Sequence, residues 1–425
     1  SRKINLKGEM QRTGFIAPSV PFAERQKINM KQKLSKQNLL LVGFTLFSMF
    51  FGAGNLIFPP FLGAQAGSLT WRAMEGFLIS AVGLPVLGVA AVALSGGLPS
   101  LAKKVHPAFA FLFTLLIYLS IGPCLAIPRT ASTSFEMTVL PILTGMRFEM
   151  GQLVGGTGFT LQTAAQFGYS ALFFMAAMAV AFRPEKLTDR LGKVLCPALL
   201  ILIGVIFTGC LVWPMGPYGA PEAVYSAGPV VKGFLEGYQT MDTIAALNFG
   251  IIIAINIRAK GVDQEGAVVR ETVKAGVIAG ILLALVYGAL AHIGAPAGAA
   301  AADTRNGARI LTYVAGSLFG NAGMMILGVI FLIACFNTCV GLLSCCSQYF
   351  TTIIPVIGYR VWVFVFAAVS LVISSAGLNR ILTVSEPVLN AIYPVAIVLI
   401  VLAFLGPLTR RWPSMFPCSI LLTGI

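Results

Sequence analysis

The chain contains 425 residues, of which 57% are hydrophobic and 10% are charged, and its formal net charge is +14. Soluble domains carry about 25% charged residues, so this composition excludes a soluble fold. The basic residues form short clusters between apolar runs, a pattern that argues against nucleic acid as a partner. We therefore expect an all-α polytopic membrane protein that contacts membrane lipid.

The two ends of the chain differ from its apolar middle. Residues 1–37 are predicted to form a polar, basic N-terminal leader, of which we expect 1–29 to precede the native start, because Met30 opens a short basic lead into the first apolar run. Residues 38–408 are predicted to form a ten-helix core. Residues 409–425 are interpreted as the start of an eleventh helix, truncated at the C-terminus.

A helix needs about 20 predominantly apolar residues to cross a bilayer. On that basis the predicted spans lie near residues 38–60, 72–95, 107–127, 166–182, 191–213, 242–257, 272–294, 320–349, 360–377, 381–405 and 414 to the end. Lys and Arg concentrate in cytoplasmic loops, and most of them here fall on the side of the N-terminus. The pattern predicts a multi-pass protein whose N-terminus is cytoplasmic.

The first predicted span contains glycines and an asparagine near its midpoint, in the run Phe51-Gly52-Ala53-Gly54-Asn55. In hydrocarbon, non-helical backbone is tolerated only where it is buried in protein or lines a polar cavity. A break here exposes carbonyl groups that suit a hard cation and N–H groups that suit a carboxylate. The alternative is that Gly52 and Gly54 serve only for close helix packing.

A second candidate break lies at the start of the sixth span, where Asp242 and Asn248 precede a strongly apolar run. Ionisable groups in spans are costly and commonly functional. The alternative is that Asp242 is an interfacial residue or a helix cap. The two candidate breaks are about 190 residues apart, and each begins a block of five spans. This arrangement is typical of five-plus-five inverted-repeat transporters with discontinuous helices 1 and 6, which bind substrate at the bilayer midplane.

Three charged residues are candidates for gating. Arg129 and Glu136 share a helical face if the helix continues past Pro128, so they are expected to pair or to serve as an external gate or, equally, to be solvated charges of an outer vestibule. Glu386 lies in an apolar stretch of the tenth span and is a weaker candidate.

Candidate cation ligands come from the first and eighth spans. Backbone oxygens of Phe51 and Gly52, together with the hydroxyls of Thr338 and Ser344, are predicted to form an oxygen cage for Na+. The alternative is that each hydroxyl bonds its own helix backbone.

Several function classes lack their usual motifs. The two histidines and eight cysteines do not have metal-ligand spacing, so no metal beyond the Na+ site is predicted. Neither a nucleophile elbow nor a nucleotide-binding loop is present, so we expect no enzyme and no cofactor other than a coupling ion. An ion channel is a less favoured alternative, because the sequence has two separated breaks rather than filter repeats.

The first break lies in a longer motif that resembles the bacterial branched-chain amino acid:cation symporter family, the system II leucine, isoleucine and valine carriers. The matching runs are Phe51-Gly-Ala-Gly-Asn-Leu-Ile-Phe-Pro-Pro60, Leu62-Gly, Gln65-Ala-Gly67, Ala81-Val-Gly-Leu-Pro-Val86, Pro128-Arg-Thr130, Ser134-Phe-Glu136, Thr240-Met-Asp242, Phe249-Gly250 and Ala391-Ile-Tyr-Pro394. The family belongs to the amino acid-polyamine-organocation superfamily. Glu386 has no clear match in the family pattern.

The resemblance implies twelve spans and uptake of L-leucine, L-isoleucine and L-valine with Na+ or H+ across the bacterial cell membrane. A carrier for another neutral or aromatic amino acid is the alternative. The expected substrate site comprises Gly52 to Asn55 for the carboxylate, Asp242 for the ammonium group, and apolar residues including Phe249 for the side chain. The coupling ion, the substrate ranking and the oligomeric state are not predicted.

Overall fold

The computed structural model describes residues 33–145, 160–183, 193–300, 307–405, 411–412 and 414–424. Every regular element in these ranges is a helix, as expected from the composition. Most of the predicted leader lies outside the described residues, and the first helix begins at Lys36.

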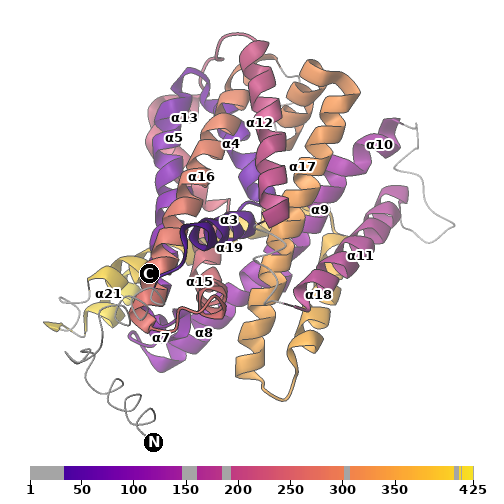
Figure 1. Cartoon of the computed structure of the whole chain (residues 1–425). Helices are drawn as coiled ribbons and strands as arrows, with labels where there is room; N and C mark the ends of the chain where they lie inside the picture. The colour runs from indigo at the N-terminus through magenta and orange to yellow at the C-terminus, as the bar shows by residue number, and fades with distance from the viewer. Residues whose placement is uncertain are drawn as a thin grey trace, which may run out of the picture.

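The first half of the chain forms α3 (Lys36–Phe50), α4 (Ala53–Ala66), η1 (Gly67–Leu69), α5 (Thr70–Leu78), η2 (Ile79–Gly83), α6 (Leu84–Ser95), α7 (Leu98–Ala102), α8 (Pro107–Leu119), η3 (Ser120–Cys124), α9 (Ala126–Thr138), α10 (Leu140–Gly145), α11 (Leu161–Ala181) and α12 (Cys196–Val212). The second half forms α13 (Ala223–Ala227), α14 (Pro229–Tyr238), α15 (Asp242–Ala259), α16 (Glu265–Ala300), α17 (Gly307–Ile353), α18 (Tyr359–Ser374), α19 (Leu378–Phe404) and α21 (Met415–Thr423). In Figure 1, α21 lies on the opposite side of the molecule from α10 and α11.

Within the described ranges, 8 helical stretches are long and apolar enough to cross a bilayer. The remaining predicted spans correspond to shorter elements. The first span is divided into α3 and α4, with 15 and 14 residues, the ninth is the 16-residue α18, and the last is the 9-residue α21. The first of these is short because the helix is broken, as the glycine run predicts.

Two corresponding groups of contacts organise the core. The divided first span, α3 and α4, packs on α16, while the divided sixth span, α14 and α15, packs on α5 and α6. Span one therefore contacts span seven, and span six contacts span two. In two repeats of five spans, spans one and two correspond to spans six and seven, so these two contacts are equivalent. The five-plus-five architecture with discontinuous helices 1 and 6 is confirmed.

Glycines allow the closest approaches in both groups. A β-carbon placed on Gly63 of α4 would lie 2.1 Å from the carbonyl oxygen of Ala291 in α16. A β-carbon on Gly233 of α14 would lie 1.9 Å from the carbonyl oxygen of Ala73 in α5. Such backbone contacts are typical of helices packed through small residues in membranes. They hold both broken spans against unbroken partners.

Candidate functional site

The first break separates α3 from α4 at Phe51 and Gly52. The last backbone bond of α3 runs from the Phe51 N–H to the Phe47 carbonyl, 2.8 Å away. Gly52 is extended (φ −126°, ψ −155°), and its N–H donates to Asn55 Oδ1 at 3.0 Å instead of continuing the helix. The asparagine that the sequence singled out therefore fixes the start of α4.

This break leaves backbone groups of both kinds without helical partners. In the described part of the chain, no helical bond joins the carbonyls of Ser48, Met49 and Phe50 to the N–H groups four residues on, and the N–H groups of Ala53, Gly54 and Asn55 have no backbone acceptor. The carbonyl end of α3 therefore faces cations favourably, and the N-terminal end of α4 faces anions favourably.

The second break lies between α14, which ends at Tyr238, and α15, which begins at Asp242. Met241 has φ 67°, in the left-handed region that a side chain other than glycine rarely adopts, and it is the one such residue in the described ranges. Backbone strain of this kind is commonly found at functional sites. The helix is interrupted at the sequence position predicted from Asp242.

The two breaks are joined by hydrogen bonds between buried side chains. Asn55 Nδ2 donates to Asp242 Oδ2 at 2.6 Å, and Tyr287 Oη of α16 donates to the same oxygen at 2.7 Å. Asn55 also hydrogen bonds to Tyr287. Asp242 is 2% exposed and is the first residue of α15, after the N-cap residue Met241, and Asn55 connects its carboxylate to the start of α4.

Arg129 of α9 lies between the two breaks. Its guanidinium Nη1 donates to the Gln239 carbonyl of the second break at 3.1 Å. Its Nη2 lies beside Gly54 in the first turn of α4, where an added β-carbon would be 2.7 Å away. The residue is 4% exposed. The arginine that was expected at an external gate is thus part of the central site.

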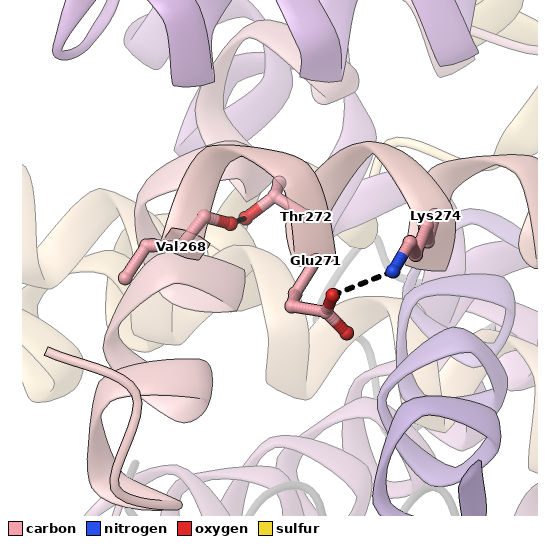
Figure 2. A network of polar contacts seen from close by, with 4 residues as sticks. All are labelled: Val268, Glu271, Thr272 and Lys274. Atoms are coloured by element: carbon pink, nitrogen blue, oxygen red, sulfur yellow. Dashed lines mark hydrogen bonds and ion pairs between the residues drawn. The ribbon is translucent and has the colours of Figure 1, made fainter. Parts of the chain in front are cut away.

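Two other buried carboxylates have a lysine at contact distance. Glu271 of α16 is 1% exposed, and its Oε1 lies 2.7 Å from Lys274 Nζ, one turn further along the helix (Figure 2). Glu236 of α14 pairs with Lys232 at 2.6 Å. Asp242 differs from both, because its closest polar partners are neutral side chains.

The breaks enclose a small cavity. It is lined by Met49, Phe50, Gly52, Ala53, Asn55, Ile121, Ala126, Arg129, Thr130, Thr240, Met241, Asp242, Ala245, Thr338 and Leu342. The free space is about 20 Å³, which is room for about one water molecule. An amino acid therefore enters only if surrounding side chains move apart.

Of the two predicted hydroxyl ligands, one reaches the first break. Thr338 of α17 packs on Gly52, where an added β-carbon would lie 2.6 Å from Oγ1, and this buried hydroxyl has no hydrogen-bond partner in the described structure. Ser344 is buried away from the cavity and donates to the Val340 carbonyl of its own helix at 2.8 Å. Thr338 alone of the pair lies at the first break and lines the cavity.

The remaining predicted residues do not line the cavity. Phe51 and Phe249 are buried in the apolar core, with Phe249 packed on Phe50 at a ring distance of 5.3 Å. Glu136 lies near the Leu378 backbone and Arg309, so the expected pairing with Arg129 is not formed. Glu386 is exposed on α19.

Sequence reasoning missed two parts of the site. Tyr287 lies in an ordinary apolar run, and tyrosines in membrane helices are common enough that it carries no distinguishing signal. The Gln239 carbonyl belongs to a break that follows α14, the first half of the sixth span, and α14 was not predicted as part of a span. Its Lys232 and Glu236 lower the local hydropathy, although they pair with each other.

The fold and the site define a helical membrane transporter in which two discontinuous helices meet at a buried polar cavity. The family model described as "Branched-chain amino acid transport protein" matches residues 35–425, and the chain belongs to this family.

Individual relatives agree with this assignment. The chain is 41% identical to the branched-chain amino acid permease BraB of Bacillus subtilis, over 93% of this chain and 86% of the relative. It is 38% identical to the permease BrnQ of Escherichia coli strain K12, over 90% and 83% respectively.

Solved structures share the fold. MhsT in complex with L-phenylalanine matches with a TM-score of 0.59 and 14% identity, over 92% of this chain and 99% of the other. Mhp1, a nucleobase-cation-symport-1 family transporter, matches in a closed conformation with bromovinylhydantoin bound, with a TM-score of 0.53 and 14% identity over 91% and 90%. At this identity the likeness concerns the fold alone.

Proposed function

We propose that the protein is a symporter that takes up leucine, isoleucine and valine with Na+ or H+ across the bacterial cell membrane, with its N-terminus in the cytoplasm. The observation that carries the proposal is the direct 2.6 Å hydrogen bond between Asn55 of the first break and Asp242 of the second. It brings together the helix ends that bind charged groups in transporters of this architecture. The names of the family and of its relatives supply the substrate class.

The backbone at the breaks supports binding of an α-amino acid. N–H groups at the start of α4, near Ala53 to Asn55, suit the substrate carboxylate. The Asp242 carboxylate and the carbonyls of the second break suit the ammonium group. Apolar lining from Ile121, Ala245 and Leu342 suits an aliphatic side chain. One methylene is worth about 1 to 3 kcal/mol in such a pocket, so all three branched substrates are expected to be accepted.

The surroundings of Gly52 support a cation site. Free carbonyls at the end of α3 and the unpartnered Thr338 hydroxyl are all neutral oxygen ligands, which Na+ and other hard cations prefer. If H+ is the coupling ion instead, Asp242 is the buried carboxylate placed to carry it, since it lies at the second break and hydrogen bonds to Asn55 of the first.

Radiolabelled leucine uptake into proteoliposomes tests the proposal. We expect uptake driven by an inward Na+ gradient or an inward H+ gradient, and unlabelled isoleucine and valine should compete. One co-transported charge moving down 100 mV releases about 2.3 kcal/mol, which supports roughly 40-fold accumulation. Uptake that is indifferent to both gradients would refute symport.

Variants of Thr338 locate the cation. Thr338→Val keeps the shape of the side chain but removes the hydroxyl. We expect it to lower Na+-stimulated uptake about tenfold, which corresponds to about 1.4 kcal/mol, the strength of one hydrogen bond. Thr338→Ser retains the hydroxyl and should keep most of the stimulation. Equal Na+ dependence in the valine and serine variants would exclude Thr338 as a ligand.

A further inference from the structure

The cavity contains two buried groups of opposite charge that do not contact each other. Arg129 and Asp242 both line it, and no ion pair within 4.0 Å joins either of them to another described side chain. By contrast, the buried carboxylates of Glu236 and Glu271 each have a lysine at contact distance. A buried charge without a contacting counter-charge is strongly unfavourable. A ligand with both charges would relieve both groups at once.

The free donors of Arg129 point to where an anion would bind. A guanidinium has five N–H donors, and a single hydrogen bond, from Nη1 to the Gln239 carbonyl, is found for Arg129 among the described residues. Nη2 lies beside Gly54, in the first turn of α4, where the backbone N–H groups are also free. Side-chain and backbone donors therefore converge at the start of α4, which lines the cavity through Ala53 and Asn55, and both kinds bind carboxylates.

We infer that Arg129 is a ligand of the substrate carboxylate, so that the site recognises the zwitterion through two opposite charges, Arg129 for the carboxylate and Asp242 for the ammonium group. This inference rests on the proposed function. It assigns Arg129 to substrate recognition rather than to an external gate. A residue that served only to clamp the two breaks together, through Gln239 and Gly54, would affect every ligand equally.

A ligand that lacks the carboxylate separates these two roles. Binding of leucine and of leucinamide to the purified full chain in detergent is measured calorimetrically at about pH 6.5, where both α-amino groups are protonated. Wild-type protein is expected to prefer leucine by about 10- to 100-fold, the range for hydrogen bonds to a charged group. In Arg129→Gln, leucine affinity should fall by that factor while leucinamide affinity changes less than about threefold.

Two further variants keep the test decisive. Arg129→Lys retains the charge without the planar guanidinium, and we expect the preference of this variant for leucine over leucinamide to fall by about tenfold. This variant provides the test if Arg129→Gln does not fold. Arg72→Gln, an exposed arginine of α5, serves as the matched control and should keep the wild-type preference.

The outcomes distinguish a failure of the Arg129 assignment from a failure of the proposed function. Arg129 variants that lose leucine and leucinamide affinity equally, or that keep the wild-type preference, would overturn the inference alone. Wild-type protein that binds no branched-chain amino acid would overturn the proposed function and this inference with it.

Discussion

Gly54→Leu is expected to abolish leucine uptake while the chain still inserts into the membrane. Gly54 packs closely against Arg129 and the second break, where an added β-carbon would lie 2.7 Å from Arg129 Nη2, 3.2 Å from the Gln239 carbonyl oxygen and 3.2 Å from Thr240 Cα. The backbone of the second break cannot move away as a flexible side chain can. A leucine side chain therefore displaces Arg129 and separates the two breaks.

The control for this variant is a glycine in a membrane helix with open space around it. Gly204 of α12 has no atom within 4 Å of an added β-carbon, so Gly204→Leu should leave uptake near the wild-type rate. Gly54→Ala should be intermediate, since its β-carbon displaces the guanidinium but requires only a small shift of the second break. Uptake in proteoliposomes, normalised to protein recovered as a single size-exclusion peak, measures all three. Normal uptake by Gly54→Leu would contradict the placement of the site at the breaks.

Asp242→Asn is expected to produce the second large loss. The amide oxygen of asparagine can still accept the hydrogen bonds from Asn55 and Tyr287, so the local structure should be retained. What is removed is the negative charge that meets the substrate ammonium group. Removing one partner of a buried charge pair costs about 2 to 5 kcal/mol, or roughly 30- to 4,000-fold in affinity.

Ligand variation again separates binding from structure. 4-Methylpentanoic acid has the carboxylate and side chain of leucine but no ammonium group. Wild-type protein should therefore bind it far more weakly than leucine, and Asp242→Asn should lose that preference. Tyr287→Phe, which leaves the carboxylate in place but removes one donor, should lose roughly 10- to 100-fold in leucine affinity with the preference retained. If Asp242→Asn keeps the wild-type preference, the carboxylate does not contact the ammonium group.

The position of the first break could be predicted from the sequence because its cause is local. Two glycines, an asparagine and a mid-span position together limit the backbone to a few arrangements, and Asn55 bonds within its own segment to Gly52. Asp242 was similarly recognisable as an ionisable residue at the start of an apolar run. In both cases the residue type itself indicates an energetic cost in the membrane, that of non-helical backbone at the glycines and that of a buried charge at Asp242.

The neighbours of these residues depend on tertiary contacts that spacing does not reveal. Arg129 was assigned to an external gate because the third span was predicted to end near residue 127, whereas α9 continues to Thr138 and buries the arginine against the Gln239 carbonyl. Thr338 and Ser344 looked equivalent in sequence, yet Thr338 faces Gly52 whereas Ser344 bonds to its own helix. Such choices are decided by helix rotation, which hydropathy does not report.

A structure of the full chain with leucine bound is the decisive test of a binding site at the two breaks. We expect leucine between the breaks, with its carboxylate within hydrogen-bond distance of the N–H groups of Ala53 to Asn55 and its ammonium group beside Asp242. A hollow of about 500 Å³ between α6, α15 and α16, lined by Val92, Gly250 and Arg258, lies outside this site. Leucine bound there, with the breaks unoccupied, would contradict a binding site at the breaks.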